Sequence, residues 1–71
     1  PKAQEDEAVR AHIDAMTPQE REALTEQALG IASGEWIYRR AKTQEARDGV
    51  IRSKMMDIVR KVLQEATAAL D

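Results

Sequence analysis

The sequence predicts an all-α fold, a compact bundle of three or four short helices with a long C-terminal helix. Two observations predict it. Apolar residues recur at spacings of three and four along most of the chain, and no stretch of four or more residues alternates between apolar and polar side chains as a strand would. With only 71 residues, 1–71 is expected to form a single small domain, either as a whole protein or as a segment of a larger one.

The first helix is predicted over 4–16. Val9, Ile13 and Met16 are spaced by four and three residues and therefore share one helix face. Acidic residues occupy positions 5–7, in the first turn, where the positive end of the helix dipole favours carboxylates.

A second helix is predicted to begin directly after the first. Thr17 can cap it, Pro18 suits its first position, and Glu20 can reach back to the cap amide to complete a capping box. We expect it to end at Gly30 or Gly34. Its expected apolar face recurs every three or four residues and consists of Leu24, Ala28 and Ile31. The short connections between helices predict antiparallel neighbours.

The second half of the chain predicts a short helical segment and then the longest helix. The segment, over 35–42, carries the only tryptophan and the only tyrosine, and we expect Trp36 and Ile37 to pack into the core. Thr43 or Asp48 can cap the last helix, which is expected to be the spine of the bundle. Its continuous stripe consists of Ile51, Met55, Ile58, Val59, Val62, Leu63, Ala66 and Leu70.

The net charge of −2 conceals an uneven distribution. Residues 1–34 carry three basic and seven acidic side chains, a net charge of −4, whereas 35–61 carry eight basic and four acidic side chains, a net charge of +4. The two regions can pair with each other, within one molecule or between copies. The basic region can also face a phosphate backbone.

Catalytic and metal chemistry find little support in this composition. There is no cysteine and only one histidine, so a thiolate zinc site and a histidine cluster are excluded. Glu22 and Glu26 fall on the polar side of their helix, and His12 borders an apolar stripe. We therefore expect a non-enzyme without a cofactor, a metal or a small-molecule substrate.

Membrane insertion and export find no support either. No apolar run approaches the roughly 18 residues that span a bilayer, and the first residues show no signal-peptide pattern. The expected location is cytoplasmic.

Residues 26–42, EQALGIASGEWIYRRAK, resemble the turn and recognition helix of helix-turn-helix proteins. The resemblance implies a turn glycine in the left-handed conformation, followed by a helix that lies in the major groove of DNA. The alternative function is therefore that of a small DNA-binding domain that uses a basic patch over 39–54.

A second resemblance spans about 13–63. The segments MTPQEREALTEQAL and VIRSKMMDIVRKVL resemble the C-terminal helical portion of plasmid and phage replication initiator proteins. This resemblance implies an accessory module of a DNA-replication protein that binds DNA, a helicase or another copy of itself.

The residues themselves favour a non-catalytic helical interaction module, because the last aliphatic stripe is too long for the two shorter helices to cover. A protein partner or self-association is then the expected interaction, with DNA as the alternative. The expected partner interface consists of Trp36, Met55, Ile58 and Val62. The expected contacts to nucleic acid or to an acidic partner are Arg39, Arg40, Lys42 and Arg47, and we expect the first three to face solvent beside Arg47.

Overall fold

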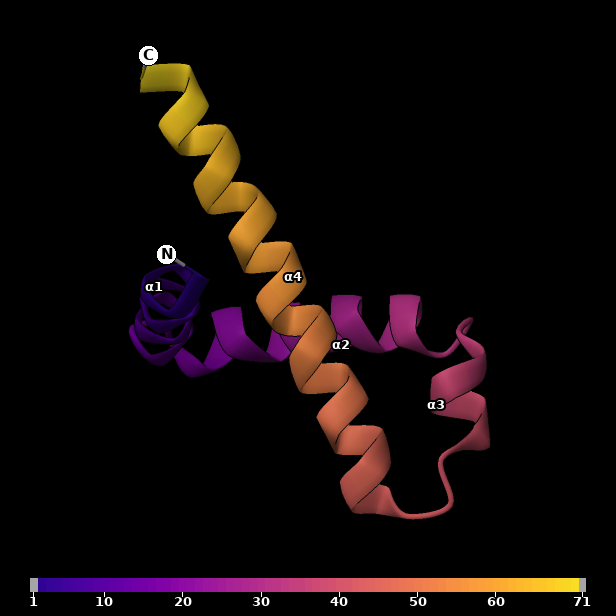
Figure 1. Ribbon diagram of the computed structural model, residues 1–71. Helices are drawn as coiled ribbons and strands as arrows, with labels where there is room; N and C mark the ends of the chain where they lie inside the picture. The colour runs from indigo at the N-terminus through magenta and orange to yellow at the C-terminus, as the bar shows by residue number, and fades with distance from the viewer. Residues whose placement is uncertain (1, 71) are drawn as a thin grey trace.

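The computed structural model describes the backbone of residues 2–70 and the side chains of residues 6–69. It is all-α, as predicted, and no strand occurs within this described part (Figure 1). The four helices are α1 (Lys2–Asp14), α2 (Pro18–Ala32), α3 (Trp36–Arg40) and α4 (Gln44–Leu70).

The boundary between α1 and α2 is set by the Thr17-Pro18 pair. Thr17 is extended, with φ −67° and ψ 160°, as expected for a residue that precedes proline. The Thr17 hydroxyl accepts a hydrogen bond from the Glu20 amide at 3.1 Å, and the Thr17 amide donates to Glu20 Oε1 at 2.9 Å. The predicted capping box is confirmed. α1 ends at Asp14, before this capping box and two residues earlier than predicted.

α2 ends at Ala32, so Gly34 lies just beyond it and Gly30 lies inside it. The buried side chains of α2 are Leu24, Ala28 and Ala32, each four residues from the next. Ile31 was expected on this face but is 46% exposed. The residue four positions after Ala28 is buried, and the residue three positions after it is not.

α4 is 27 residues long and contacts each of the other three helices, which confirms it as the spine. Thr43 caps it, because the Thr43 hydroxyl accepts from the Ala46 amide at 3.1 Å. The expected antiparallel arrangement of α1 and α2 is not observed. In Figure 1, α1 is seen nearly end-on, whereas α2 runs across the picture behind α4.

The core lies where α1 and α2 cross the middle of α4. It consists of five buried side chains, Val9, Leu24, Ala28, Met55 and Val59. Partly buried apolar side chains surround it, namely Ile13, Met16, Ile51, Met56, Ile58 and Leu63. Such a small core leaves a narrow margin of stability, so the loss of one core side chain has a large effect.

Polar contacts hold α1 in place at both of its ends. Arg60 on α4 contacts Asp6 of α1 at 2.8 Å and Asp57 at 2.9 Å, and these hydrogen bonds raise the pKa of the guanidinium. At the other end, Arg21 on α2 donates to the backbone oxygens of Asp14 and Met16, at 3.3 and 3.2 Å. The guanidinium of Arg21 thereby satisfies carbonyl groups at the end of α1.

We expect Val59→Ala to lower the free energy of unfolding by about 2 kcal/mol, because Val59 is 3% exposed and its loss leaves a cavity in the core. Urea denaturation followed by circular dichroism measures this change. Val62→Ala, one turn further along and 52% exposed, is the matched control and should cost less than about 0.5 kcal/mol. Equal costs for the two variants would contradict this location of the core.

We expect Thr17→Ala to lower the free energy of unfolding by about 1 kcal/mol. The variant loses the bond that the hydroxyl accepts, and it weakens the bond from the backbone amide to Glu20, because the hydroxyl stabilises the cap conformation. Thr67→Ala is the control: Thr67 lies inside α4, where its hydroxyl bonds only to the Leu63 carbonyl. Thermal unfolding of both variants tests the difference.

Stability should also depend on the capping box in the acid range. The backbone hydrogen bond from Thr17, and then the bond with its hydroxyl, lower the pKa of Glu20 below its ordinary value of 4.5. A lowered folded-state pKa gives a contribution that is present above pH 4.5 and is lost as the pH falls through the folded-state value. In Glu20→Gln, where the amide keeps the bond without titrating, stability should fall less steeply between about pH 5 and pH 3.

Candidate interaction surfaces

The α3 corner is the turn of chain that joins α2 to α4, and we define it by Trp36, Ile37, Arg39, Arg40 and Lys42. α3 is a helix of only five residues, and the Glu35 side chain before it makes no capping bond. The Glu35 carboxylate instead contacts Lys54 Nζ on α4 at 2.8 Å, and this hydrogen bond raises the pKa of Lys54. The pair attaches the start of α3 to α4.

The expectation that Trp36 and Ile37 pack into the core is wrong. Trp36 is 69% exposed and Ile37 is 51% exposed. α3 lies at the end of α2 far from α1 and packs against α4, with Tyr38 of α3 and Ala41 just after it partly buried (Figure 1). The core is complete without α3, because α1 and α2 already cover the middle of α4.

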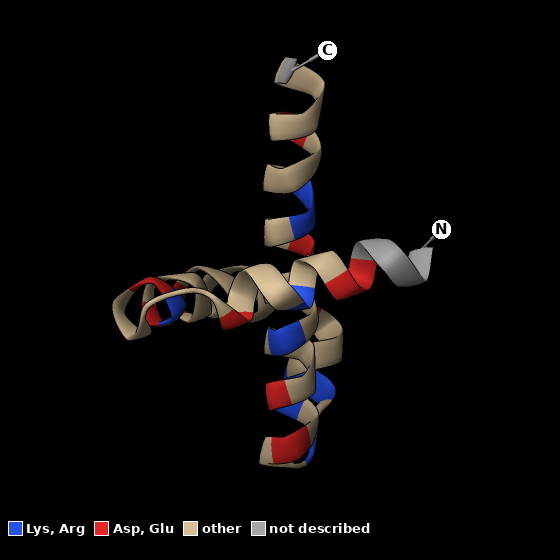
Figure 2. Ribbon diagram, turned by 90° about the vertical axis from the view of Figure 1, so that its left-hand side faces the viewer, with Lys and Arg blue, Asp and Glu red and all other residues tan. Residues whose placement is uncertain are grey.

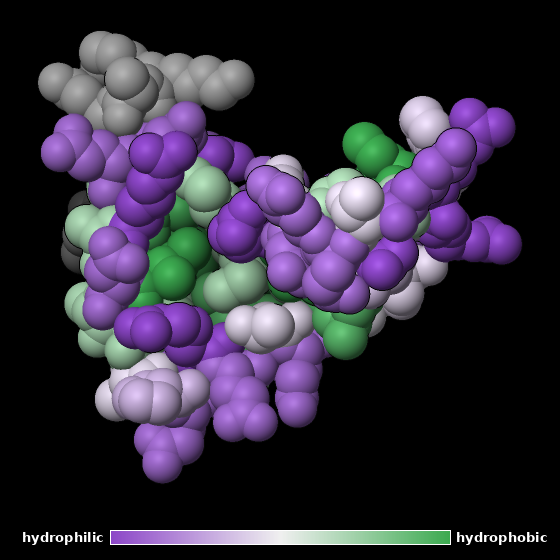
Figure 3. Space-filling view, turned by 90° about the horizontal axis from the view of Figure 1, so that it is seen from below, coloured by the Kyte–Doolittle hydropathy of each residue, from purple (hydrophilic) through white to green (hydrophobic). Residues whose placement is uncertain are grey.

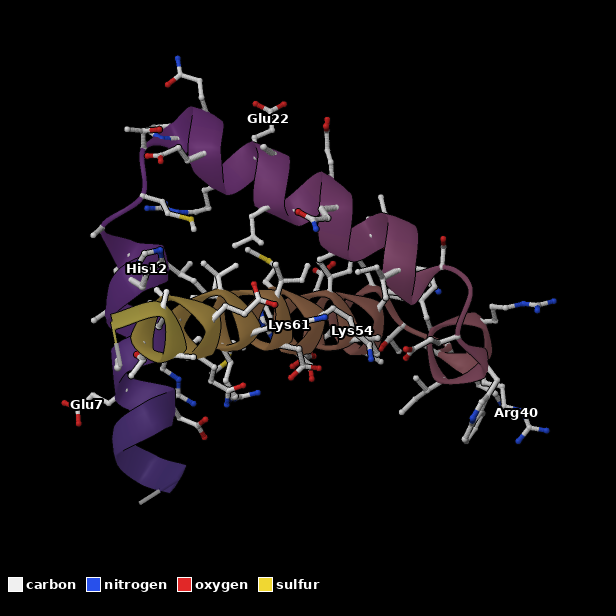
Figure 4. The ribbon with its side chains drawn as sticks, turned by 90° about the horizontal axis from the view of Figure 1, so that it is seen from above. Glu7, His12, Glu22, Arg40, Lys54 and Lys61 are labelled. Atoms are coloured by element: carbon white, nitrogen blue, oxygen red, sulfur yellow. The ribbon has the colours of Figure 1, made fainter. Side chains whose placement is uncertain are left out.

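The basic residues of the α3 corner are exposed, as predicted. None of Arg39, Arg40 and Lys42 forms an ion pair with a described residue. The Arg40 guanidinium lies over the Trp36 ring, 5.6 Å from its centroid, which is the geometry of a cation–π contact. Figure 4 shows Arg40 at the end of the molecule opposite α1, pointing outward.

Arg47 differs from the other predicted contact residues. It is half-buried, and its Nη1 donates to the Ala41 carbonyl at 3.1 Å, while Nη2 donates to Gln44 Oε1 at 3.4 Å. Arg47 therefore holds the connection between α3 and α4, and its guanidinium is less available to a partner than the other three cations.

The helix-turn-helix geometry expected for 26–42 does not form. Gly30 lies within α2, and no described glycine has a positive φ. The expected recognition helix is reduced to the five residues of α3, shorter than two turns. The wider basic patch over 39–54 is also divided, because Lys54 is paired and acidic residues are interspersed with basic ones along α4 (Figure 2).

The expected partner interface separates into different environments. Met55 is 9% exposed and belongs to the core, so it offers little surface to a partner. Ile58 is half-buried, whereas Val62 is 52% exposed. Trp36 is exposed at the other end of the molecule, so these four residues do not form one surface.

A hollow with a basic rim lies on the underside of the crossing between α1 and α4. Figure 3 shows an apolar floor there with hydrophilic side chains around it. Apolar side chains of Ile13, Met55 and Met56 line the hollow, together with the polar residues Arg10, Asp14, Arg21 and Arg52. Arg21 is occupied with the end of α1, so the hollow's basic character depends mainly on the other two arginines.

The candidate catalytic groups among the described side chains are not brought together. His12, Glu22 and Glu26 are exposed, and Glu22 points away from the molecule in Figure 4. Within residues 6–69, no group of three or more histidine or acidic side chains is placed to hold a metal ion. In the same part of the chain, every helix is too short or too polar to cross a membrane.

The pair of Glu35 and Lys54 was not predicted, because its members are far apart in sequence and lie on separate elements. Nothing in the local pattern marks Lys54 among the basic residues of its helix. The contact of Arg40 with Trp36 joins two residues one helical turn apart, so it could have been found from their spacing.

No protein-family model, no curated protein and no solved structure matches this chain.

Proposed function

We propose that the chain is a non-catalytic helical interaction module that binds an acidic protein surface through the α3 corner. The observation that carries the proposal is the exposure of Trp36, 69%, in contact with the guanidinium of Arg40. Tryptophan and arginine are the side chains that contribute most often to binding energy at protein interfaces.

The composition of the α3 corner suits this role. Trp36 and Ile37 supply apolar area that becomes buried on binding, and Arg39, Arg40 and Lys42 surround it with positive charge. The contact with Arg40 restricts the tryptophan before any partner arrives, which reduces the entropy lost on binding. The pair of Glu35 with Lys54 restricts the helix that carries them.

A protein partner is favoured over DNA for reasons of size and charge. A helix of five residues cannot span a major groove and present several side chains to base edges. The α3 corner offers only three exposed cations, which are few for phosphate binding by a chain whose net charge is −2. An acidic protein surface can place carboxylates beside apolar side chains. Such a surface matches the cations and apolar side chains of the α3 corner more closely than a DNA backbone does. If the resemblance to replication initiators holds, the partner is a protein of the replication machinery.

Trp36 is the only tryptophan, so its fluorescence reports directly on the α3 corner. We expect an acidic peptide of alternating glutamate and leucine residues to shift its emission to shorter wavelength on titration, because binding removes the ring from water. The double variant Arg39→Glu/Arg40→Glu should bind at least about tenfold more weakly, since it places like charges opposite the peptide.

The matched control is Arg10→Glu/Arg52→Glu, which makes the same change of charge at the hollow under α1. Its affinity for the peptide should stay within about threefold of the parent chain if binding is local to the α3 corner and not a result of overall charge. Equal losses in both double variants, or no shift with the peptide, would reject the proposal. Binding of duplex DNA that weakens steeply between about 50 and 200 mM salt would favour the nucleic-acid alternative.

A further inference from the structure

The side of α2 that is turned away from α4 is exposed and acidic. Glu22, Glu26 and Leu29 are spaced by four and three residues, so they share one helix face, and all three are exposed. The buried Leu24 and Ala28 lie on the opposite side of α2, in the core with α4. Figure 4 shows Glu22 on the side of α2 away from α4. We call Glu22, Glu26 and Leu29 the outer α2 face.

The outer α2 face combines negative charge with an apolar side chain. Neither Glu22 nor Glu26 forms an ion pair with a described residue. The one basic residue of α2, Arg21, is occupied with the end of α1 and does not neutralise them. Leu29 is 40% exposed and lies one helical turn from Glu26. This is the composition that suits the cations and apolar side chains of the α3 corner.

Other exposed apolar side chains of the described residues lack such surroundings. Val62 has one cation, Lys61, and one carboxylate, Glu65, beside it, so its neighbourhood carries no net charge. Ile31 is 46% exposed, but the carboxylate one turn after it, Glu35, is already paired. Outside the α3 corner, Leu29 is therefore the exposed large apolar side chain that lies beside net negative charge.

We propose that the acidic partner of the α3 corner is the outer α2 face of a second copy of this chain. This inference rests on the proposed function and names the partner. Trp36 of one copy packs on Leu29 of the other, and the two arginines of the corner pair with the two glutamates of the face. The lengths are similar: at 1.5 Å per residue, the face spans about 10 Å of helix axis and α3 spans about 8 Å.

One molecule does not make this contact with itself. α3 is held beside α4 by the contact of Glu35 with Lys54 at 2.8 Å, and the connection after it is held by the bond from Arg47 to the Ala41 carbonyl. The outer α2 face is turned away from α4, so the corner and the face of one chain point in different directions (Figure 4). Because they are two different surfaces, copies join head to tail, and assembly is not limited to two chains.

Sedimentation velocity of the chain from about 10 µM to about 1 mM tests the assembly, because a small interface gives weak affinity. We expect the average mass to rise with concentration. Glu22→Lys/Glu26→Lys should raise the concentration needed for association at least about tenfold, since it places like charges opposite the corner. Arg39→Glu/Arg40→Glu should have the same effect. An equimolar mixture of the two variants should associate again, because each altered or intact surface then meets one of opposite charge.

The matched control for overall charge is Glu7→Lys/Glu65→Lys. It makes the same change of net charge at exposed positions outside both surfaces, and it should leave the concentration needed for association within about threefold of the parent chain. Circular dichroism checks that helix content is unchanged in every variant, as expected for exposed positions.

The apolar part of the contact has its own matched pair of variants. Leu29→Ala should weaken association at least about fivefold, because Leu29 is expected to be covered by Trp36 of another copy. Ile31→Ala should leave association within about twofold, although Ile31 is 46% exposed, because it lies two residues away on the other side of α2.

Three results would overturn the proposal. The first is a monomer at every concentration, the second is association that Glu22→Lys/Glu26→Lys leaves intact, and the third is a mixture of the two charge-reversed variants that stays monomeric. Titration with the acidic peptide of glutamate and leucine distinguishes the two proposals. Peptide binding by a chain that stays monomeric overturns self-association alone, whereas the absence of both rejects the proposed function as well.

Discussion

The structure depends on the packing of Val9 from α1 and of Leu24 and Ala28 from α2 against Met55 and Val59 of α4. α1 and α2 make few contacts with each other beyond the connection between them, so α4 is the common support for both. Ala28 is completely buried, and its small side chain lets α2 cross close to α4. Every other element is placed by its attachment to this crossing.

A single crossing near the middle of a 27-residue helix leaves both ends of that helix open. At one end the α3 corner is held by polar contacts, the pair of Glu35 with Lys54 and the bonds of Arg47. At the other end Val62 is 52% exposed. Exposed apolar side chains therefore lie at both open ends, Trp36 and Ile37 at the first and Val62 at the second.

The helices could be predicted because their signals are local. Thr17, Pro18 and Glu20 lie within four residues of one another, and their capping box forms as expected. The faces of the helices were harder to assign. Ile31 and Ala32 are adjacent, both apolar and both compatible with the stripe, and only the crossing of α2 with α4 places Ala32 inside. Whether Trp36 is buried depends on whether α3 packs against the core. The hydrophobicity of the α3 residues alone does not show this.

Folding changes how the charge of the chain is presented. The basic middle of the sequence is partly neutralised, because Lys54 and Arg60 pair with acidic residues from other elements. Arg39, Arg40 and Lys42 form no ion pair with a described residue and lie together at the α3 corner, whereas Arg10 and Arg52 line the hollow under α1. If the α3 corner binds an acidic partner as proposed, its positive charge attracts that partner before contact, and the attraction weakens as salt is added.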